Sequence, residues 1–221
     1  MRNKVCTGVL AIGIPASLGS LLMSVSQIVL NSQMAHYGNM AVAGIGVAAK
    51  VTMITGMFCI GMGQGVQPLI GFCVGAKKWE RFKKIMNFSI VFALLLSVVM
   101  TGICYLFTEQ IVHAFLTDQT AFEYGVQFAR ILLSTGFLFG LFYVLCNALQ
   151  AMGAATEALV VNLSRQGIIY IPALFLLQAV LDVSGLVWAQ PVADVLSLAV
   201  VAVLVAVTMR RMKAQNQPAA G

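Results

Sequence analysis

Charged residues are missing from most of this sequence, and long segments contain none at all. Only 9% of the 221 residues are Asp, Glu, Lys or Arg, whereas a soluble globular domain carries roughly 25%. The charge-free segments cover residues 5–49, 51–76, 85–108 and 131–156. Each is longer than the roughly 20 apolar residues that span a bilayer. The scarcity of charge excludes a water-soluble protein and predicts an all-α integral membrane protein.

Motifs for catalysis and for fuel hydrolysis are also absent. The sequence contains no H-E-x-x-H, no paired aspartates within an apolar segment and no phosphate-binding G-x-x-x-x-G-K-[ST]. Its five cysteines form no C-x-x-C pair, and none of them is separated from a histidine by the spacing typical of metal ligands. We therefore expect neither an enzyme nor an ATP-driven pump, and we predict no bound cofactor or metal.

The sequence does contain six apolar segments that turn residues and charges separate. We predict a single six-helix domain over residues 1–213 and a disordered cytoplasmic tail over residues 214–221. The predicted transmembrane spans lie near residues 5–34, 40–74, 87–107, 125–151, 157–180 and 186–209. The first two exceed the length that a bilayer requires, so we expect them to tilt or bend.

Basic residues are concentrated in the stretch GAKKWERFKK, residues 75–84. It holds five of the thirteen basic residues, namely Lys77, Lys78, Arg81, Lys83 and Lys84. Others precede the first span and follow the sixth, while the remaining short loops carry acidic residues. Because positive residues in short loops mark the cytoplasmic side, both termini are predicted to be cytoplasmic and the stretch to anchor the topology. Binding of anionic lipid or nucleic acid by the same residues is the alternative.

Polar residues inside the predicted spans are the candidate site residues. In the first span, Gln27 and Asn31 continue a stripe that begins with three serines at intervals of three or four residues, on one helix face. Lys50 and Gln64 lie 14 residues apart in the second span and share a face, and Asn147 lies in the fourth. Hydrogen bonding between helices and the lining of a water-filled pathway both explain such residues.

Lys50 and Asp194 are candidates for an ion pair within the membrane. A lysine inside the bilayer costs at least roughly 2.5 to 3.5 kcal/mol on insertion scales, so it needs a partner or water. Counted from the external ends of their spans, both residues lie roughly 14 to 16 Å deep. A static structural pair and a proton-linked switch both fit these positions. Arg165, near the cytoplasmic end of the fifth span, is expected to extend to the membrane interface instead.

Four segments of the chain carry a family resemblance. They are PASLGSLLMSVSQIVLNSQMAHYGNMAVAGIGVAAK, GMGQGVQPLIGFCVGAKK, NLSRQGIIYIPALFLL and WAQPVADVLSL. In this order, between about residue 8 and residue 211, they resemble the second six-helix lobe, the C-terminal half, of a multidrug and toxic compound extrusion (MATE) transporter. Within that family the chain is most similar to the bacterial multidrug exporters.

The resemblance implies a part of a secondary active transporter in the bacterial cytoplasmic (inner) membrane. Members of this family have two six-helix lobes around a central cavity and exchange H⁺ or Na⁺ for cationic drugs by alternating access. The implied partners are the lipid bilayer, a small cationic drug and a second lobe, which is either a missing N-terminal half or a second copy of this chain. For such a transporter we predict an ion and substrate pathway from the polar residues identified above. In it, Gln27, Asn31, Gln64 and Asn147 line the cavity, and Lys50 and Asp194 form a pair that changes between inward-open and outward-open states.

Two other functions fit the same resemblance. One is a flippase for a lipid-linked substrate from the same superfamily, which a strongly basic cavity would favour. The other is a non-transporting fragment that needs an N-terminal lobe. The acidic residue that some subgroups carry in the equivalent of the first span is missing here, since the stripe in that span consists of Ser, Gln and Asn.

Overall fold

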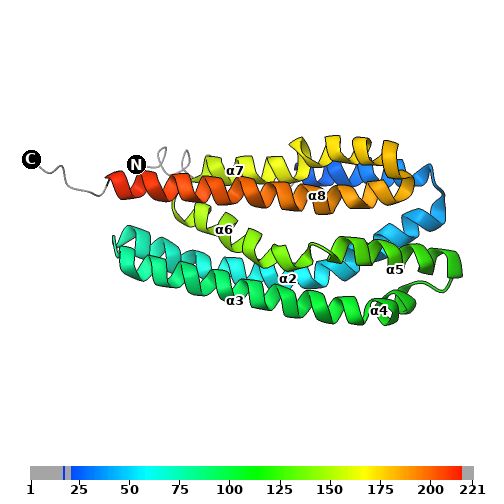
Figure 1. The fold of residues 1–221 in the computed structure, drawn as a ribbon, viewed down its shortest axis with the longest axis horizontal. Helices are drawn as coiled ribbons and strands as arrows, with labels where there is room; N and C mark the ends of the chain where they lie inside the picture. The colour runs from blue at the N-terminus through cyan, green and yellow to red at the C-terminus, as the bar shows by residue number, and fades with distance from the viewer. Residues whose placement is uncertain (1–16, 18–20, 216–221) are drawn as a thin grey trace, which may run out of the picture.

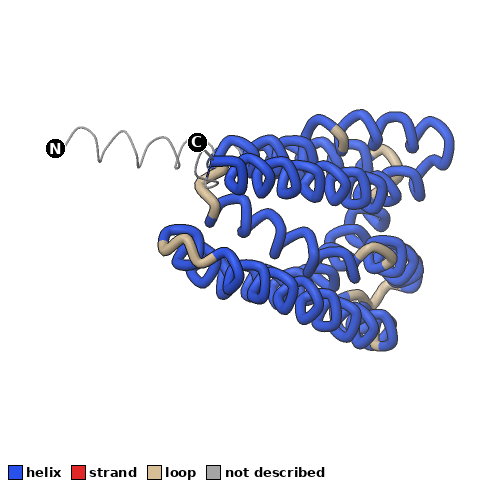
Figure 2. The backbone as a smooth tube through the Cα atoms, turned by 60° about the vertical axis from the view of Figure 1, so that its left-hand side comes forward, coloured by secondary structure: helices blue, strands red, loops and turns tan. Residues whose placement is uncertain are grey.

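The computed structural model describes residue 17 and residues 21–215, and this part of the chain consists of helices and turns (Figure 2). The predicted all-α fold is thereby confirmed for the described residues. The start of the predicted first span, the basic residues Arg2 and Lys4, and residues 216–221 of the predicted tail lie outside them. The first two residues of that tail belong to the last helix, which ends at Gln215.

The helices follow one another through short turns. Residues 21–35 form the first helical segment. It is followed by α2 (Asn39–Gly75), α3 (Trp79–Leu106), α4 (Thr108–Phe115), α5 (Gln119–Leu133), the 3-10 turn η1 (Gly136–Leu138), α6 (Phe139–Ala151), α7 (Ala155–Leu163), the π-helical turn η2 (Ser164–Ile168) and α8 (Tyr170–Gln215).

Four helical stretches of the described chain are long and apolar enough to cross a membrane. They are Asn39–Gly75, Trp79–Leu106, Gln119–Ala151 and Thr156–Met212. The second predicted span agrees with α2 to within one residue at each end. The third begins at Trp79 rather than near residue 87, because only residues 76–78 form the turn and the rest of the basic stretch is already helical.

The fourth stretch folds back on itself at Asp182, whose backbone is not helical (φ 50°, ψ −132°). A Cβ atom placed on Gly185 would lie 2.0 Å from the carbonyl oxygen of Leu177. Eight residues of a continuous helix span about 12 Å, so this approach requires a reversal of the chain. Figure 1 shows the two arms of α8, in yellow and in orange to red, side by side. The predicted fifth span, residues 157–180, comprises α7, η2 and most of the first arm, and the predicted sixth span, residues 186–209, lies within the second arm.

Helix α6 connects two layers of the fold (Figure 1). On one side it packs against α2 and α3, and on the other against α7 and α8. Buried apolar side chains fill both contacts, with Ile70, Phe82 and Val144 on the first side and Leu149, Val161 and Val201 on the second. Because lipid is as apolar as these side chains, the contacts stabilise the fold through close packing rather than through the exclusion of water.

Glycine allows α2 to approach α6 closely. A Cβ atom on Gly63 would lie 2.6 Å from Nδ2 of Asn147 and 3.0 Å from the carbonyl oxygen of Tyr143. No side chain fits at these distances, so the packing of α2 on α6 requires glycine at this position.

Candidate functional site

The helix formed by α5 and α6 is interrupted at residues 134–138, where Ser134, Thr135 and Gly136 follow one another. Ser and Thr hydroxyls compete for backbone hydrogen bonds, and glycine weakens a helix, so this sequence favours a break. The hydroxyl of Ser97 in α3 donates a hydrogen bond to the carbonyl oxygen of Phe137 (2.6 Å). A backbone group that the break releases within the membrane therefore has a partner from a neighbouring helix.

A second interruption lies between α7 and α8. The π-helical turn η2 is closed by a hydrogen bond from the Ile169 amide to the Ser164 carbonyl oxygen (2.9 Å). The hydroxyl of Ser26, in the first helical segment, donates to the carbonyl oxygen of Gln166. Both helix breaks thus receive a serine hydroxyl from a neighbouring helix. π-helical turns occur frequently at functional sites, which directs attention to the one charged side chain of this turn, Arg165.

Arg165 forms a buried ion pair with Asp194, which lies in the second arm of α8. Nε of the arginine lies 2.7 Å from Oδ1 of the aspartate, and the two side chains are only 9% and 4% exposed. Two further donors hold the carboxylate. Gln190 Nε2 donates to Oδ1 (3.0 Å), and Thr135 Oγ1, from the break between α5 and α6, donates to Oδ2 (3.4 Å).

Three aromatic rings of α6, the helix that follows η1, lie close to the guanidinium group of Arg165. Its Cζ atom lies 4.6 Å from the ring centre of Phe142, 5.4 Å from that of Phe139 and 5.7 Å from that of Tyr143. A cation over an aromatic face is attracted by about 0.5 to 2 kcal/mol, and more strongly where water is excluded. The charge on Arg165 is therefore stabilised by the rings as well as by Asp194.

We call Thr135, Arg165, Gln190 and Asp194 the buried charge cluster. Its chemistry is asymmetric, because a guanidinium group does not release its proton in proteins whereas a carboxylate accepts one. Any change of charge in the cluster takes place at Asp194. Thr135 lies at one helix break and Arg165 at the other, so the carboxylate of Asp194 bonds to side chains at both breaks.

Comparison with known proteins shows which family uses this architecture. A sequence profile of the family described as MatE matches residues 15–176. The chain belongs to the MATE family. The multidrug export protein MepA of Staphylococcus aureus (strain NCTC 8325 / PS 47) is 31% identical over 215 residues, which cover 95% of this chain and 46% of MepA. MepA of Staphylococcus saprophyticus is 27% identical over 208 residues, with coverages of 94% and 46%.

Solved MATE structures share the fold. The Vibrio cholerae MATE transporter VcmN in its bent form has a TM-score of 0.89 at 18% identity and covers 98% of this chain and 50% of its own. A multidrug resistance MATE transporter in an outward-facing conformation gives 0.87, and one in an inward-facing conformation gives 0.86, both at 18% identity. The match to the outward-facing structure covers 95% of this chain and 48% of the transporter's chain, and the match to the inward-facing structure covers 97% and 50%. The MATE chain described here thus spans about half the length of the relatives that it matches.

The structure corrects the predicted ion pair of this MATE chain. Asp194 binds Arg165 rather than Lys50, which is exposed on α2. The expectation that Arg165 extends to the membrane interface is also wrong, since the side chain is buried. A signal for the true pair exists in the sequence. Counted from the turn at Asp182, Arg165 lies 17 residues before and Asp194 lies 12 residues after, an offset of about 7 Å along antiparallel arms that a long arginine side chain bridges.

The other predicted pathway residues do not join the buried charge cluster. Gln27, Asn31 and Gln64 are exposed on the surface of the MATE lobe. Asn147 is half-buried, and its Nδ2 atom donates to the carbonyl oxygen of Tyr143 (2.8 Å). The structure therefore leaves Asp194 buried and Asn147 half-buried, whereas the other predicted residues are exposed, namely Gln27, Asn31, Lys50 and Gln64.

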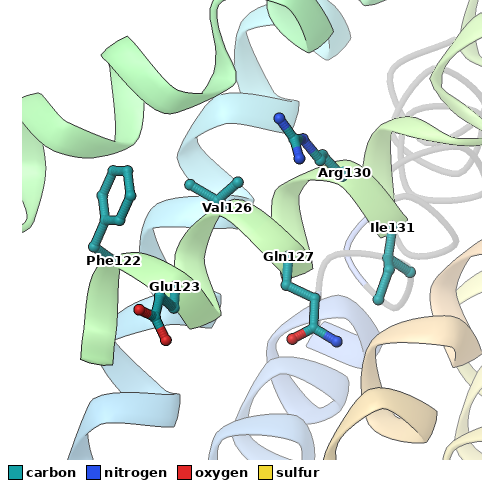
Figure 3. A pocket seen from close by; sticks show the side chains of 6 residues that line it. All are labelled: Phe122, Glu123, Val126, Gln127, Arg130 and Ile131. Atoms are coloured by element: carbon teal, nitrogen blue, oxygen red, sulfur yellow. The ribbon is translucent and has the colours of Figure 1, made fainter. Parts of the chain in front are cut away.

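A shallow pocket lies elsewhere on this MATE chain, along α5. Its lining consists of Phe122, Glu123, Val126, Gln127, Arg130 and Ile131. Figure 3 shows the Glu123 and Gln127 side chains on one side of α5 and Arg130 on the other. Gln127 contacts Ser184 near the turn of α8 (3.4 Å), and Arg130 forms an exposed ion pair with Glu109 (2.8 Å). Gln127 and Arg130 are thus paired with residues outside the pocket lining, and neither belongs to the buried charge cluster.

Within residues 21–215, no group of three or more His, Cys, Asp or Glu side chains is arranged to hold a metal ion. The four cysteines of this range are free and buried. They are Cys59, Cys73, Cys104 and Cys146, and they behave as small apolar residues of the packed helices.

Proposed function

We propose that this chain is one lobe of a cation-coupled MATE multidrug exporter that works by alternating access, and that the Arg165–Asp194 pair is its switching element. The observation that carries the proposal is a buried ion pair held between two broken helices. Broken helices mark the binding and gating regions of many membrane transporters. An ionisable residue within a membrane segment is a functional candidate by default, because it costs free energy to keep there.

Alternating access is supported by the likeness to two conformations. The lobe resembles an outward-facing and an inward-facing relative about equally well. A fold that fits both states changes little within itself, so the larger movement lies between lobes. Such a movement needs a trigger inside the lobe, and the buried charge cluster is a suitable one.

The geometry favours a proton over a sodium ion as the coupling ion. Both carboxylate oxygens of Asp194 already accept hydrogen bonds. A sodium ion would have to approach against the positive charge of Arg165, whereas a proton neutralises Asp194 in place. Arg165 then loses its ionic partner in a dry environment, which favours a conformation that admits water. Ser197, one helical turn beyond Asp194, has a buried hydroxyl without a partner among the described residues, as is common where a water or ion binds.

Four exposed polar residues support a second lobe as partner. They lie on the first helical segment and on α2, which are both mainly apolar, and they are Gln27, Asn31, Lys50 and Gln64. Against lipid, each of these groups would lack hydrogen-bond partners and cost free energy. We therefore expect water or protein to cover these residues in the membrane, as a central cavity between this lobe and another would.

A flippase for an anionic lipid-linked substrate is less well supported. Its cavity would need several uncompensated cations. Arg165 is neutralised by Asp194, and Lys50 is the only charged residue of α2. Lys50 and Arg165 thus provide little uncompensated positive charge for such a substrate.

The test is ethidium movement into liposomes that contain the purified chain, under imposed proton and sodium gradients. A double variant, Arg165→Met with Asp194→Leu, removes both charges together, so it retains the fold without leaving a charge unpaired. We expect the unaltered chain to move ethidium with the proton gradient and the double variant to be inactive. Transport by the double variant at the original rate would assign the pair a structural role only.

Two further results of the same experiment separate the alternatives. Movement driven by the sodium gradient alone would overturn the choice of coupling ion. No movement by a folded, unaltered chain would show that the chain alone is not a transporter and needs an N-terminal lobe.

A further inference from the structure

An apolar groove runs between α2 and α3, on the surface of the lobe and apart from the buried charge cluster. Ten residues line it, and they are Gly61, Met62, Gly65, Val66, Leu69, Lys84, Ile85, Phe88, Ser89 and Phe92. Among them a single residue, Lys84, carries a charge.

The floor of the groove is open because of two glycines. No heavy atom lies within 4 Å of a Cβ atom placed on Gly61 or on Gly65. One wall consists of Phe88 and Phe92, whose rings stack with centroids 5.9 Å apart. These rings are 68% and 45% exposed, so the protein itself does not cover the groove.

The lining residues come in a regular order from the turn at residues 76–78 outward. Leu69 and Lys84 come first, then Gly65 and Phe88, and then Gly61 and Phe92. The eight residues from Lys84 to Phe92 cover about 12 Å along α3. One leaflet contributes about 15 Å of hydrocarbon, half of the bilayer core. The groove therefore has the length of one lipid tail in one leaflet, with a cation at the end near the turn.

The charge around that end is strongly positive. Lys77, Lys78 and Arg81 lie beside Lys84, and no carboxylate pairs with any of these four in the described chain. Only Lys83 is partly neutralised, by an exposed ion pair with Glu80 (3.3 Å). Such a region repels a cationic drug and attracts a phosphate group.

We propose that the groove between α2 and α3 binds one acyl chain of an anionic phospholipid, and that Lys84 holds its phosphate. The basic stretch then has a second role besides anchoring the topology. The lipid lies in the leaflet on the side of the basic turn, which the distribution of charge predicts to be the cytoplasmic one. The inference is independent of the proposed transport function, since it uses no residue of the buried charge cluster.

Native mass spectrometry of the full chain, released from bilayers of phosphatidylglycerol and phosphatidylcholine with identical acyl chains, tests the site. We expect phosphatidylglycerol to remain bound in preference. Lys84→Gln should weaken its binding by about fivefold, which corresponds to roughly 1 kcal/mol for one basic residue near anionic lipid. Lys83→Gln is the matched control, because this lysine does not line the groove, and it should change binding by less than about twofold.

A second pair of variants tests the groove without any change of charge. Gly65→Leu fills the open floor and should abolish retention of phosphatidylglycerol. Gly46→Leu is its control on the same helix, since nothing lies within 4 Å of a Cβ atom there either, and it should bind lipid normally. Circular dichroism confirms that each variant is folded.

Three results would overturn the proposal. Equal losses in Lys83→Gln and Lys84→Gln would show general attraction to the basic stretch rather than a site. Unchanged lipid binding in Gly65→Leu would show that the groove is not used. A lipid-free dimer of the chain that Gly65→Leu dissociates would show that another helix, not a lipid, occupies the groove.

Discussion

Asp194→Asn should lower the free energy of unfolding by about 3 to 5 kcal/mol, the cost of leaving one partner of a buried ion pair alone. Arg165 keeps its charge in this variant but loses its anionic partner, and the nearest aromatic ring lies 4.6 Å away. Arg165→Met should cost less, about 1 to 3 kcal/mol, because Asp194 keeps the hydrogen bonds from Gln190 and Thr135 and can become neutral by taking up a proton. The asymmetry follows from the different surroundings of the two charges.

The double variant Arg165→Met with Asp194→Leu should be about as stable as the unaltered chain, since apolar residues often replace a buried pair without loss. A double-mutant cycle of Arg165→Met, Asp194→Leu and the double variant measures the coupling between the two positions. Unfolding by sodium dodecyl sulfate in mixed detergent micelles is followed by circular dichroism, and Asp194→Asn is measured in the same way. The coupling between the two positions should be at least about 2 kcal/mol. Glu109→Gln, which breaks the exposed pair with Arg130, is the control and should cost less than about 1 kcal/mol.

Two results would refute this reasoning. Additive effects of the two single variants would mean that the residues do not interact in the folded protein. A larger loss in Arg165→Met than in Asp194→Asn would mean that the arginine stabilises the fold through the aromatic rings more than through the carboxylate.

Two backbone predictions follow from the packing and the turn. Gly63→Ala should destabilise the protein by about 1 to 3 kcal/mol, because its Cβ atom meets Asn147 and the backbone of α6. The control Gly46→Ala should be neutral or slightly stabilising. Equal melting temperatures for the two variants would contradict the close contact at Gly63. Asp182→Gly should raise the free energy of unfolding by about 1 kcal/mol, because glycine adopts the positive φ of this turn without strain. A melting temperature below that of the unaltered chain would show that the Asp side chain is needed in the turn.

Composition and turn residues predict much of the architecture. The second span, residues 40–74, matches α2 because Gly38 precedes its apolar run and a basic turn follows it. The α-helical class follows directly from the length of the charge-free segments, since only helices and closed barrels satisfy the backbone within lipid. The start of α3 is missed by eight residues, because a basic amphipathic sequence is compatible with both a loop and the first turns of a helix.

The partner of Asp194 could not be found by the comparison of depths that suggested Lys50. Equal depth fixes the position of two residues along the membrane normal, but it does not fix the direction in which each side chain points around its helix axis. Helix α8 packs mainly against η2, α5, α6 and α7, whereas α2 packs mainly against α3, α5 and α6. The break at Thr135 and the π-helical turn at Arg165 also have no periodic signature in the sequence, and both decide which side chains meet. Gln190 and Asp194, by contrast, share a helix face because four residues separate them, and Gln190 donates a hydrogen bond to Asp194.

The reversal at Asp182 affects how the lobe enters the membrane during synthesis. The turn leaves almost no loop between the two arms of α8, so the translocation machinery receives them as one helical hairpin. Inserted singly, the helical stretch before the turn would carry Arg165 unpaired, and the stretch after it would carry Asp194 unpaired. Each such charge costs roughly 2.5 to 3.5 kcal/mol at the membrane centre. Inserted as a hairpin, Arg165 and Asp194 neutralise each other. The ion pair therefore makes the entry of the two arms a joint event, before any drug or coupling ion is present.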